Sequence, residues 1–475
     1  MNILRKIFSV NNMLKPGEIR GEIIRTRSAY NDLVRIAIPS IVEMVFVSLI
    51  SSVDIAMIGR LGFESVAAVG LATQPRLLML SVFLAMNVGV TAIVARRKGE
   101  NRPEEANRTI RNAIILVLGL TAIVTSVAIV FSRPLMLFSG AQDDTVDMST
   151  AYFRIISYFL PVNTLTMCIN AAQRGVGNTR TCMIANLSAN VVNVFMNYLL
   201  IYGKLGMPRL GVAGAAWASG IGFCVGLMIS VAALFGNRFN NDYLHISFRD
   251  DWRLHKATVK SIIKLGSNSV LEQIAQRFGV YIFAIIIANL GTAAFAAHQV
   301  GMQFLNFTFN FGNGLAVASI TLVGQMLGKK RPDLAIIYGK CSQRIAFLMS
   351  IVIVGSIILL RVPLVSIFLN RRDPANMTSF NMAVNLVFVV ACFQLLQTSV
   401  LVYAGCLRGA GDNLFVAVTM VICVAIVRPV LSAIAVYVFG LGLIGAWSAS
   451  LIDIFLRLTF VSRRFSGSKW QDKKV

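Results

Sequence analysis

Long apolar stretches, separated by short charged or Gly/Pro-containing segments, dominate the pattern of hydrophobic and polar positions along this chain. Each stretch reaches about 20 residues, the length that one α-helix needs to cross a bilayer. The long apolar segment 260–325 divides best at Asn289-Leu-Gly291. We therefore predict twelve membrane-spanning helices near residues 33–57, 66–93, 109–132, 149–172, 181–203, 211–235, 260–289, 292–325, 336–360, 379–405, 412–439 and 441–462.

The composition agrees with an all-α polytopic membrane protein. Of the 475 residues, 56% are hydrophobic and only 14% are charged, and a soluble globular chain of this length is not expected to have such a composition. No cleavable signal peptide is visible, because the basic residues 1–32 contain no separate apolar segment. We expect a basic N-terminal segment on the cytoplasmic side.

The net charge of +23 is explained by orientation in the membrane. The clusters Arg96-Arg97-Lys98, Lys329-Lys330-Arg331 and Arg463-Arg464 all fall on one side of the predicted topology. By the positive-inside rule that side is cytoplasmic, where basic residues also contact anionic lipid headgroups. We expect a multi-pass protein of the cell membrane with both termini in the cytoplasm, and no nucleic-acid partner.

The chain also repeats itself at about half its length. "RLGFESVAAVG" (60–70) is similar to "NLGTAAFAAHQ" (289–299), and "QRGVGNTR" (173–180) to "LRGAGDNL" (407–414). Six helices per half give both halves the same orientation, so the repeat is parallel, as in transporters that bind substrate between two lobes. The predicted divisions are a basic segment 1–32, an N-lobe 33–235, a cytoplasmic linker 236–259, a C-lobe 260–462 and a basic tail 463–475.

Few ionisable groups fall inside the predicted helices, and such groups usually face protein or water. Glu43 and Asp54 are 11 residues apart, close to three helical turns, so they share a face. Glu272 lies four residues before Gln276 and on its face, whereas Arg277 is rotated away. Each acid either serves a cavity or binds helices together. Arg428 and Asp453 pair either with each other or with Glu272.

Amide side chains form two stripes at helical spacing. One contains Asn186, Asn190, Asn193 and Asn197, and the other Gln299, Gln303, Asn306, Asn310 and Asn313. A stripe of amides is costly in lipid. Either the stripes line water, which their length favours, or they hydrogen-bond neighbouring helices.

These motifs together resemble the multidrug and toxic compound extrusion (MATE) transporters. The resemblance rests on "VDIAMIGRLG" (53–62), "NLGTAAFAAHQV" (289–300), "CLRGAGD" (406–412) and "LGLIGAWSAS" (441–450), and covers the chain from about residue 30. It implies two six-helix lobes and the export of amphipathic, often cationic, small molecules in exchange for H⁺ or Na⁺.

The resemblance also implies site residues. Asp54 matches an aspartate of the amino-terminal cation site, with Asn193 and Asn197 as its partners and Pro39 as the bend of the first helix. Glu272 matches a glutamate of the carboxy-terminal site, and Gln397 stands where that site has an aspartate. Asn197 likewise replaces a carboxylate of the family pattern. We expect Asp54, Asn193, Asn197 and Glu272 to carry cation coupling, and a substrate cavity formed by Glu43, Glu272, Gln276, Asn306, Asn310 and Gln397.

Two other functions compete with this interpretation. A lipid-linked oligosaccharide flippase of the same superfamily shares the two-lobe plan, but typically has a cationic cavity. A prenyltransferase-like enzyme needs clustered aspartates, whereas the acidic pairs here, Asp143-Asp144 and Asp250-Asp251, lie in loops. We expect no enzyme activity, no cofactor or metal beyond the coupling H⁺ or Na⁺, small-molecule and lipid partners, and a monomer.

Overall fold

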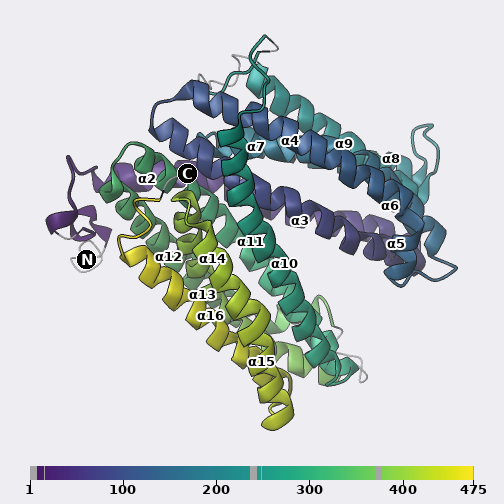
Figure 1. Cartoon of the computed structure of the whole chain (residues 1–475). Coiled ribbons are helices and arrows are strands. Elements are labelled where there is room, and N and C mark those ends of the chain that lie inside the picture. Colours follow the sequence, from purple (N-terminus) through teal and green to yellow (C-terminus); the bar gives the residue numbers. More distant parts are fainter. Residues whose placement is uncertain (1–7, 15, 236–242, 248, 370–376, 474–475) are drawn as a thin grey trace. The chain divides into compact units, whose positions relative to one another are not determined.

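The structure is a computed structural model of the whole chain, shown in Figure 1. It describes residues 8–14, 16–235, 243–247, 249–369 and 377–473. Arg5 and Lys6 of the predicted basic segment 1–32 and residues 236–242 of the predicted linker lie outside the described residues.

Every regular element of the described residues is helical, which confirms the predicted all-α class. Eleven described helices are long and apolar enough to cross a membrane, and a bent helix pair brings the number to twelve. The elements are η1 (Val10–Asn12), η2 (Pro16–Glu18), α2 (Thr26–Gly59), α3 (Phe63–Gly99), α4 (Pro103–Val130), α5 (Ser132–Phe138), α6 (Val146–Tyr158), α7 (Leu160–Gly175), α8 (Thr179–Tyr202), α9 (Gly211–Phe235), α10 (Lys256–Ala288), α11 (Thr292–Gly328), α12 (Pro332–Ser366), α13 (Met377–Gly409), α14 (Asn413–Met420), η5 (Val421–Val427), α15 (Arg428–Ala433), η6 (Ile434–Val438) and α16 (Gly442–Ser466).

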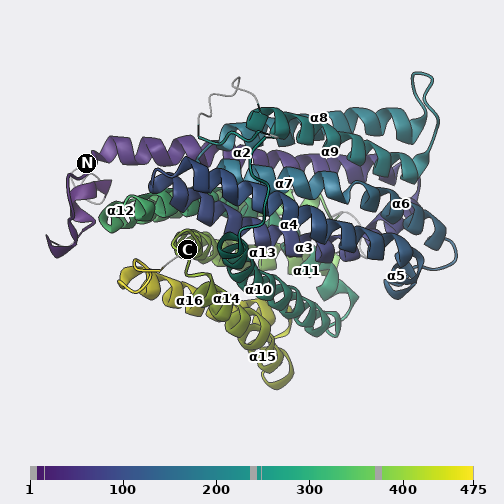
Figure 2. The same ribbon diagram turned by 45° about the horizontal axis from the view of Figure 1, so that its top comes forward.

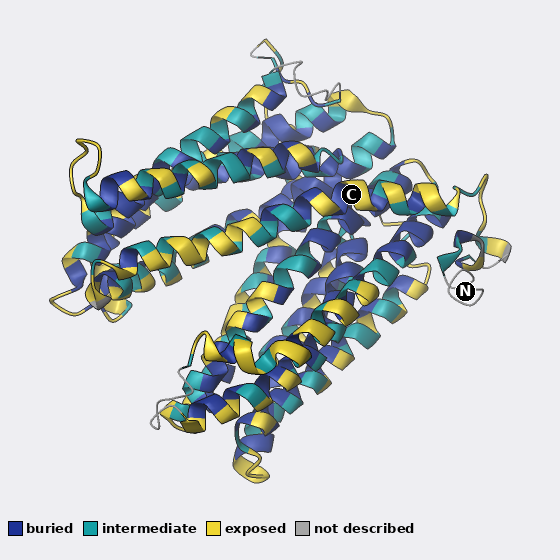
Figure 3. Cartoon of the chain, turned by 180° about the vertical axis from the view of Figure 1, so that it is seen from behind, coloured by how far each residue is buried: buried dark blue, intermediate teal, exposed yellow. Residues whose placement is uncertain are grey.

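The helices form two compact units. Unit 1 contains residues 1–41 and 267–475, and unit 2 contains residues 42–266. The boundaries therefore fall inside α2, after Ile41, and inside α10, after Gly266. Each of these two continuous helices contributes one part to each unit. Buried residues gather on the inner faces of the helices within a unit, as Figure 3 shows.

Small residues let helix backbones approach closely in both units, as is common between membrane helices. In unit 2, α9 lies beside α8 (Figure 2). A Cβ added at Gly214 would come within 2.5 Å of the Leu200 carbonyl oxygen, and one at Gly222 within 2.6 Å of the Ala189 carbonyl oxygen. In unit 1, a Cβ at Gly405 of α13 would come within 2.8 Å of the Ala316 carbonyl oxygen of α11. Side chains larger than hydrogen cannot stand at these crossings without separating the helices.

Two predicted helices are interrupted. The segment predicted as one helix over 149–172 is a pair, α6 and α7, bent by 47° next to Pro161. The segment predicted over 412–439 contains two stretches of wider π-helix, η5 and η6. Pro429 directly follows the start of α15. Because proline has no N–H and its ring crowds the carbonyl four residues back, it disturbs regular α-helical bonding at both places. The predicted break at Asn289-Leu-Gly291 is confirmed.

The described end of the linker is anchored on unit 2. Leu244 and Ile246 are buried, and the Tyr243 hydroxyl donates to the Arg97 carbonyl oxygen at 2.9 Å. Asp250 accepts a hydrogen bond from the Ser247 backbone N–H at 2.9 Å and pairs with the buried Arg111 of α4 at 2.6 Å. The Ser247 N–H and then the Arg111 guanidinium hold the pKa of Asp250 below its usual value.

We predict that Asp250→Asn loosens this anchor. A carboxyl whose pKa is lowered in the folded state stabilises that state at neutral pH, and the contribution disappears as the pH falls through the lowered pKa. Removing the charge should speed hydrogen–deuterium exchange of residues 243–250 roughly 5- to 30-fold at neutral pH, since one charged hydrogen bond contributes about 1–2 kcal/mol. The neighbouring Asp251→Asn, which removes an equal charge outside the ion pair, is the control. Equal exchange rates in wild type and Asp250→Asn would contradict the prediction.

Candidate functional site: buried carboxylates on helices α2 and α10

Asp54 lies in the part of α2 that belongs to unit 2, half-buried and facing α8. The Asn197 side-chain amide donates to Asp54 Oδ1 at 2.7 Å. With its amide turned so that nitrogen faces the acid, Asn193 donates to Asp54 at 3.0 and 3.2 Å, and its oxygen accepts from Ser219 at 3.1 Å. The hydrogen-bonding network selects this orientation, because an ionised carboxylate only accepts. The structure thus brings together Asp54, Asn193 and Asn197 as predicted.

A positive side chain lies near Asp54. Arg76, on α3, is near enough to interact electrostatically with Asp54, and its guanidinium carbon lies 5.9 Å from the centre of the Phe223 ring. The buried Asn197 Oδ1 has no hydrogen-bond partner within the described residues. Among the residues that the structure describes, the carboxylate therefore receives amide N–H groups from both asparagines, and the amide oxygen left without a partner beside it is that of Asn197.

Glu43 lies 11 residues before Asp54 on the same helix, and its side chain is buried, with 3% of the residue exposed. Its Oε1 accepts from Arg174 of α7 at 2.5 Å and from the Asn186 amide of α8 at 2.6 Å. Its Oε2 is buried and lacks a partner within the described residues. This acid is thus one half of a buried ion pair in unit 2.

The two acids of α2 contact α8 with the same spacing along both helices. Glu43 bonds Asn186 and Asp54 bonds Asn197, and each acid is 143 residues from its asparagine. The Asn190 side chain, between these two contacts, bonds within α8 instead, because it donates to the backbone carbonyl oxygen of Asn186 at 2.8 Å. Of the two predicted uses of the α8 amides, hydrogen bonding to a neighbouring helix is the one that the structure shows for Asn186, Asn193 and Asn197.

Glu272 is the corresponding acid of unit 1, on α10, and is 2% exposed. Arg408, near the end of α13, donates to its Oε1 and forms a salt bridge. Gln276 donates to the same oxygen at 3.3 Å, which confirms that it shares the face of Glu272. Arg277 is exposed, in agreement with its rotation away from this face.

The two ion pairs occupy matching places in the internal repeat. Glu272 follows Glu43 by 229 residues, and Arg408 follows Arg174 by 234 residues within "QRGVGN" and "LRGAGD". The sequence analysis used those motifs as evidence of a repeat and did not predict either arginine as a partner of an acid. The available signal was the repeat itself, which pairs an acid with an acid and an arginine with an arginine.

The remaining predicted site residues have separate settings. Pro39 is buried within α2, two residues before the unit boundary. Gln397 of α13 is buried, and its Oε1 has no partner within the described residues. On α11, Asn306 is exposed and Asn310 is half-buried. These amides belong to α11 and α13, whereas Glu272 belongs to α10.

A second charged network lies in unit 1. Asp453 of α16 is fully buried and bonds Arg428 at 2.7 and 2.9 Å and Arg457 at 3.0 and 3.1 Å. Arg428 also lies over the Phe393 ring, 5.6 Å from its centre. The first of the predicted pairings, Arg428 with Asp453, is confirmed, and Arg457 is an addition that the sequence analysis did not foresee.

Comparisons with known proteins agree with this arrangement. The MatE family model matches residues 39–199 and 269–434, which is most of the chain and falls in both halves of the repeat. The "Probable multidrug resistance protein NorM" of Thermotoga maritima is 26% identical over 453 residues, 94% of each chain. The "Multidrug resistance protein PmpM" of Pseudomonas aeruginosa is 25% identical over 391 residues, 82% of this chain and 80% of that one.

Solved structures share the fold. An outward-facing "multidrug resistance MATE family transporter of the MOP superfamily" superposes with a TM-score of 0.85 at 21% identity, covering 93% of this chain and 97% of that one. A MOP superfamily transporter from Pyrococcus furiosus gives 0.86 at 21% identity with the same coverage. The predicted resemblance is confirmed: this chain is a multi-pass membrane protein that belongs to the MatE family of MATE transporters.

Proposed function

We propose that this chain is a secondary antiporter of the cell membrane that exports amphipathic, often cationic, small molecules in exchange for H⁺. The two units would act as the lobes of an alternating-access cycle. The names of the relatives as multidrug resistance proteins support the substrate class. They give no support to the flippase alternative.

One observation carries the choice of the proton: the donor set around Asp54. Sodium binding needs several oxygen ligands, whereas Asn193 and Asn197 direct N–H groups at the carboxylate. Arg76 adds a positive charge that opposes a second cation. Asp54 can take up or release a proton without gaining the additional oxygen ligands that a sodium ion would need.

Protonation of Asp54 would change how α2 is held to α8. The ionised acid accepts hydrogen bonds from both asparagines, but the protonated acid carries its own O–H donor and can accept fewer. The proton therefore weakens one set of bonds between the two helices. If a second conformation gives Asp54 different partners and binds the proton more tightly, protonation raises the population of that conformation. The shift equals the difference in proton-binding free energy between the two conformations.

We assign Glu272 and Glu43 to the attraction of cationic substrate. In the present state each acid is neutralised by an arginine, Arg408 or Arg174. A bound organic cation would compete with that arginine, so substrate affinity depends on how readily the ion pair opens. Gln276, Asn306, Asn310 and Gln397 remain proposed as polar lining of the substrate path, and Pro39 as the bend of α2.

The proposed orientation places both termini in the cytoplasm. It is supported by the basic residues at the ends of α3 and α16, Arg96 to Lys98 and Arg463 to Arg464. No cofactor or stable partner chain is part of the proposal, and we propose a monomer.

The test is ethidium transport by purified protein in proteoliposomes, driven by an imposed proton gradient in Na⁺-free buffer. We expect gradient-dependent dye movement that a protonophore abolishes. Protein-free liposomes under the same gradient are the control. Movement only when a Na⁺ gradient is supplied would overturn proton coupling. No movement under either gradient, across a panel of amphipathic cations, would overturn the proposed export function.

A further inference from the structure

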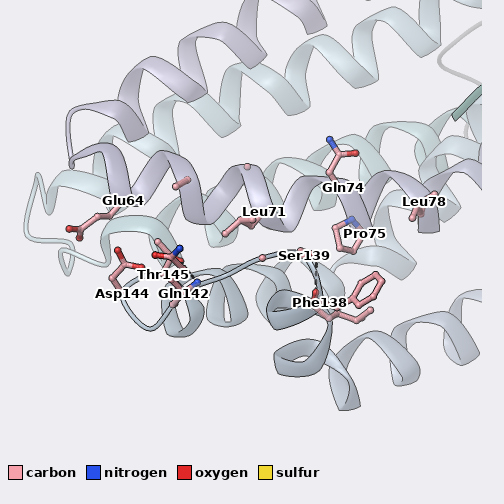
Figure 4. Close-up of a pocket in the computed structure, with 14 residues that line it drawn as sticks. Glu64, Leu71, Gln74, Pro75, Leu78, Phe138, Ser139, Gln142, Asp144 and Thr145 are labelled. Carbon is pink, nitrogen blue, oxygen red and sulfur yellow. Dashed lines mark hydrogen bonds between the residues drawn. The ribbon is translucent and has the colours of Figure 1, made fainter. Parts of the chain in front are cut away.

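A groove of about 770 Å³ lies on unit 2, between the beginning of α3 and the segment that joins α4 to α6 (Figure 4). Its lining comes from residues 64–78 on one side and residues 135–145 on the other. The lining residues include none of those assigned above to coupling or to the substrate path; Arg76, the electrostatic neighbour of Asp54, lies within residues 64–78 but does not line the groove. The volume lies within the range of roughly 300–1,000 Å³ that small-molecule sites typically have.

The α3 side of the groove is one continuous helix face. Glu64, Ala67, Leu71, Gln74 and Leu78 follow each other at spacings of three and four residues. Opposite them lie Leu135 and Phe138 of α5 and the loop that follows. The face is open in its middle, because a Cβ added at Gly70 would meet no atom within 4 Å.

The two ends of the groove differ in chemistry. Glu64 and Asp144 lie together at one end, and Leu78 and Phe138 lie toward the other, as Figure 4 shows. Both carboxylates are exposed, and neither forms an ion pair within the described residues. Phe138 is 92% exposed and Leu78 is 55% exposed. The groove thus offers negative charge at one end and uncovered apolar surface at the other.

Backbone chemistry adds a further acceptor in the middle. Pro75 lines the groove inside α3 and has no N–H, so it cannot bond the carbonyl of Leu71, four residues earlier. Leu71 lines the groove as well. An acceptor without its usual helical donor therefore lies between the acidic end and the apolar end.

We propose that this groove is a second binding site for amphipathic organic cations, separate from the Asp54 and Glu272 sites. The cationic head would lie against Glu64 and Asp144, and the apolar body along Leu71, Pro75, Leu78 and Phe138. The substrate class rests on the proposed function, but the site itself rests on the groove. Two uncompensated carboxylates repel the phosphate of a lipid headgroup, which favours a cation over a phospholipid.

Its position suggests what such a site does. The groove begins next to the α2–α3 turn, at the opposite end of α3 from the basic cluster Arg96 to Lys98. In the proposed orientation this is the outer end. A cation held there stands at the outer surface, where an exported molecule leaves the protein or returns from the outer leaflet.

The test measures binding rather than transport. Radiolabelled tetraphenylphosphonium is titrated onto full-length protein in lipid nanodiscs, with empty nanodiscs subtracted. Gly70→Leu places a side chain in the open middle of the groove, where an added Cβ meets no atom within 4 Å. Gly119→Leu is its control, because Gly119 of α4 is equally open and does not line the groove. We expect Gly70→Leu to lose one bound cation per chain and Gly119→Leu to match wild type.

The charge is tested with the double variant Glu64→Gln/Asp144→Asn. We expect roughly 5- to 20-fold weaker binding at this site, with the wild-type affinity falling as salt is raised. Asp143→Asn, which neutralises the adjacent acid outside the groove lining, should bind as wild type does. Tetraphenylborate, an anion of the same shape, should not occupy the site.

Unchanged stoichiometry in Gly70→Leu would overturn the proposal, and so would equal losses in Gly70→Leu and Gly119→Leu. Equal binding of tetraphenylborate and tetraphenylphosphonium at the Gly70-dependent site would show an apolar lipid groove instead of a cation site. Failure of proton-driven ethidium transport together with Gly70-dependent cation binding would refute only the proposed antiport. Successful transport with no Gly70-dependent binding would refute only the groove.

Discussion

Asp54→Asn is expected to abolish proton-driven dye transport while leaving the protein folded. Asparagine has the shape of aspartate and still offers an oxygen to the Asn197 amide, which donates to Asp54 at 2.7 Å. It cannot take up or release a proton in the working range of pH. Coupling to the proton gradient should therefore fall by more than about tenfold, the loss that follows when a titratable group essential to a cycle is removed. The measurement is ethidium movement in proteoliposomes at matched protein content.

The same variant should still bind tetraphenylphosphonium in the α3 groove, which separates loss of coupling from loss of folding. Asp147→Asn is the matched control, because the salt bridge of Asp147 with Arg133, at 2.8 Å, is exposed. We expect that control to transport as wild type does. Wild-type, gradient-dependent transport by Asp54→Asn would remove Asp54 from the mechanism and leave Glu272 as the remaining candidate.

The largest expected effect on stability comes from Asp453→Ala. This substitution leaves Arg428 and Arg457, 9% and 4% exposed, without the carboxylate that bonds both. Breaking a buried ion pair by removing one partner typically costs about 3–5 kcal/mol, because the remaining charge is buried uncompensated. We expect a loss of this size in the free energy of unfolding, measured by denaturant titration in mixed micelles.

A compensating variant tests the same reasoning. The triple change Asp453→Leu, Arg428→Met and Arg457→Leu removes all three charges together and should recover most of the lost stability. Asp147→Ala, which breaks the exposed pair with Arg133, should cost no more than about 1 kcal/mol. A loss of that small size for Asp453→Ala would show that the buried network contributes little to the stability of unit 1.

Helix periodicity predicted those parts of the site that depend on one helix. The partners of Asp54, Asn193 and Asn197, were implied instead by the resemblance to MATE transporters. Gln276 could be placed beside Glu272 because the two are four residues apart. Apolar length and the Asn289-Leu-Gly291 break were sufficient to place α10 and α11.

Features that depend on packing between helices were not predictable from the periodicity of single helices. Arg174 and Arg408 lie near helix ends, where a long side chain can reach either solvent or a buried acid, and periodicity does not distinguish the two. Arg457 follows Asp453 by one turn, but only its burial beside Arg428 shows that three charges form one network. Proline at positions 161 and 429 removes a backbone hydrogen bond from its helix. Whether the helix then bends or widens depends on the packing of neighbouring helices, which the sequence does not give.

The equal spacing of the contacts between α2 and α8 has a mechanical consequence. The two bonds, Glu43 to Asn186 and Asp54 to Asn197, are separated by 11 residues on both helices, or about 16 Å. A sliding of one helix along the other would break both bonds together, because neither could lengthen alone. The two contacts are therefore coupled. A change of bonding at one acid that lets α2 slide along α8 also breaks the contact at the other acid, and no chain of intervening side chains is needed to transmit it.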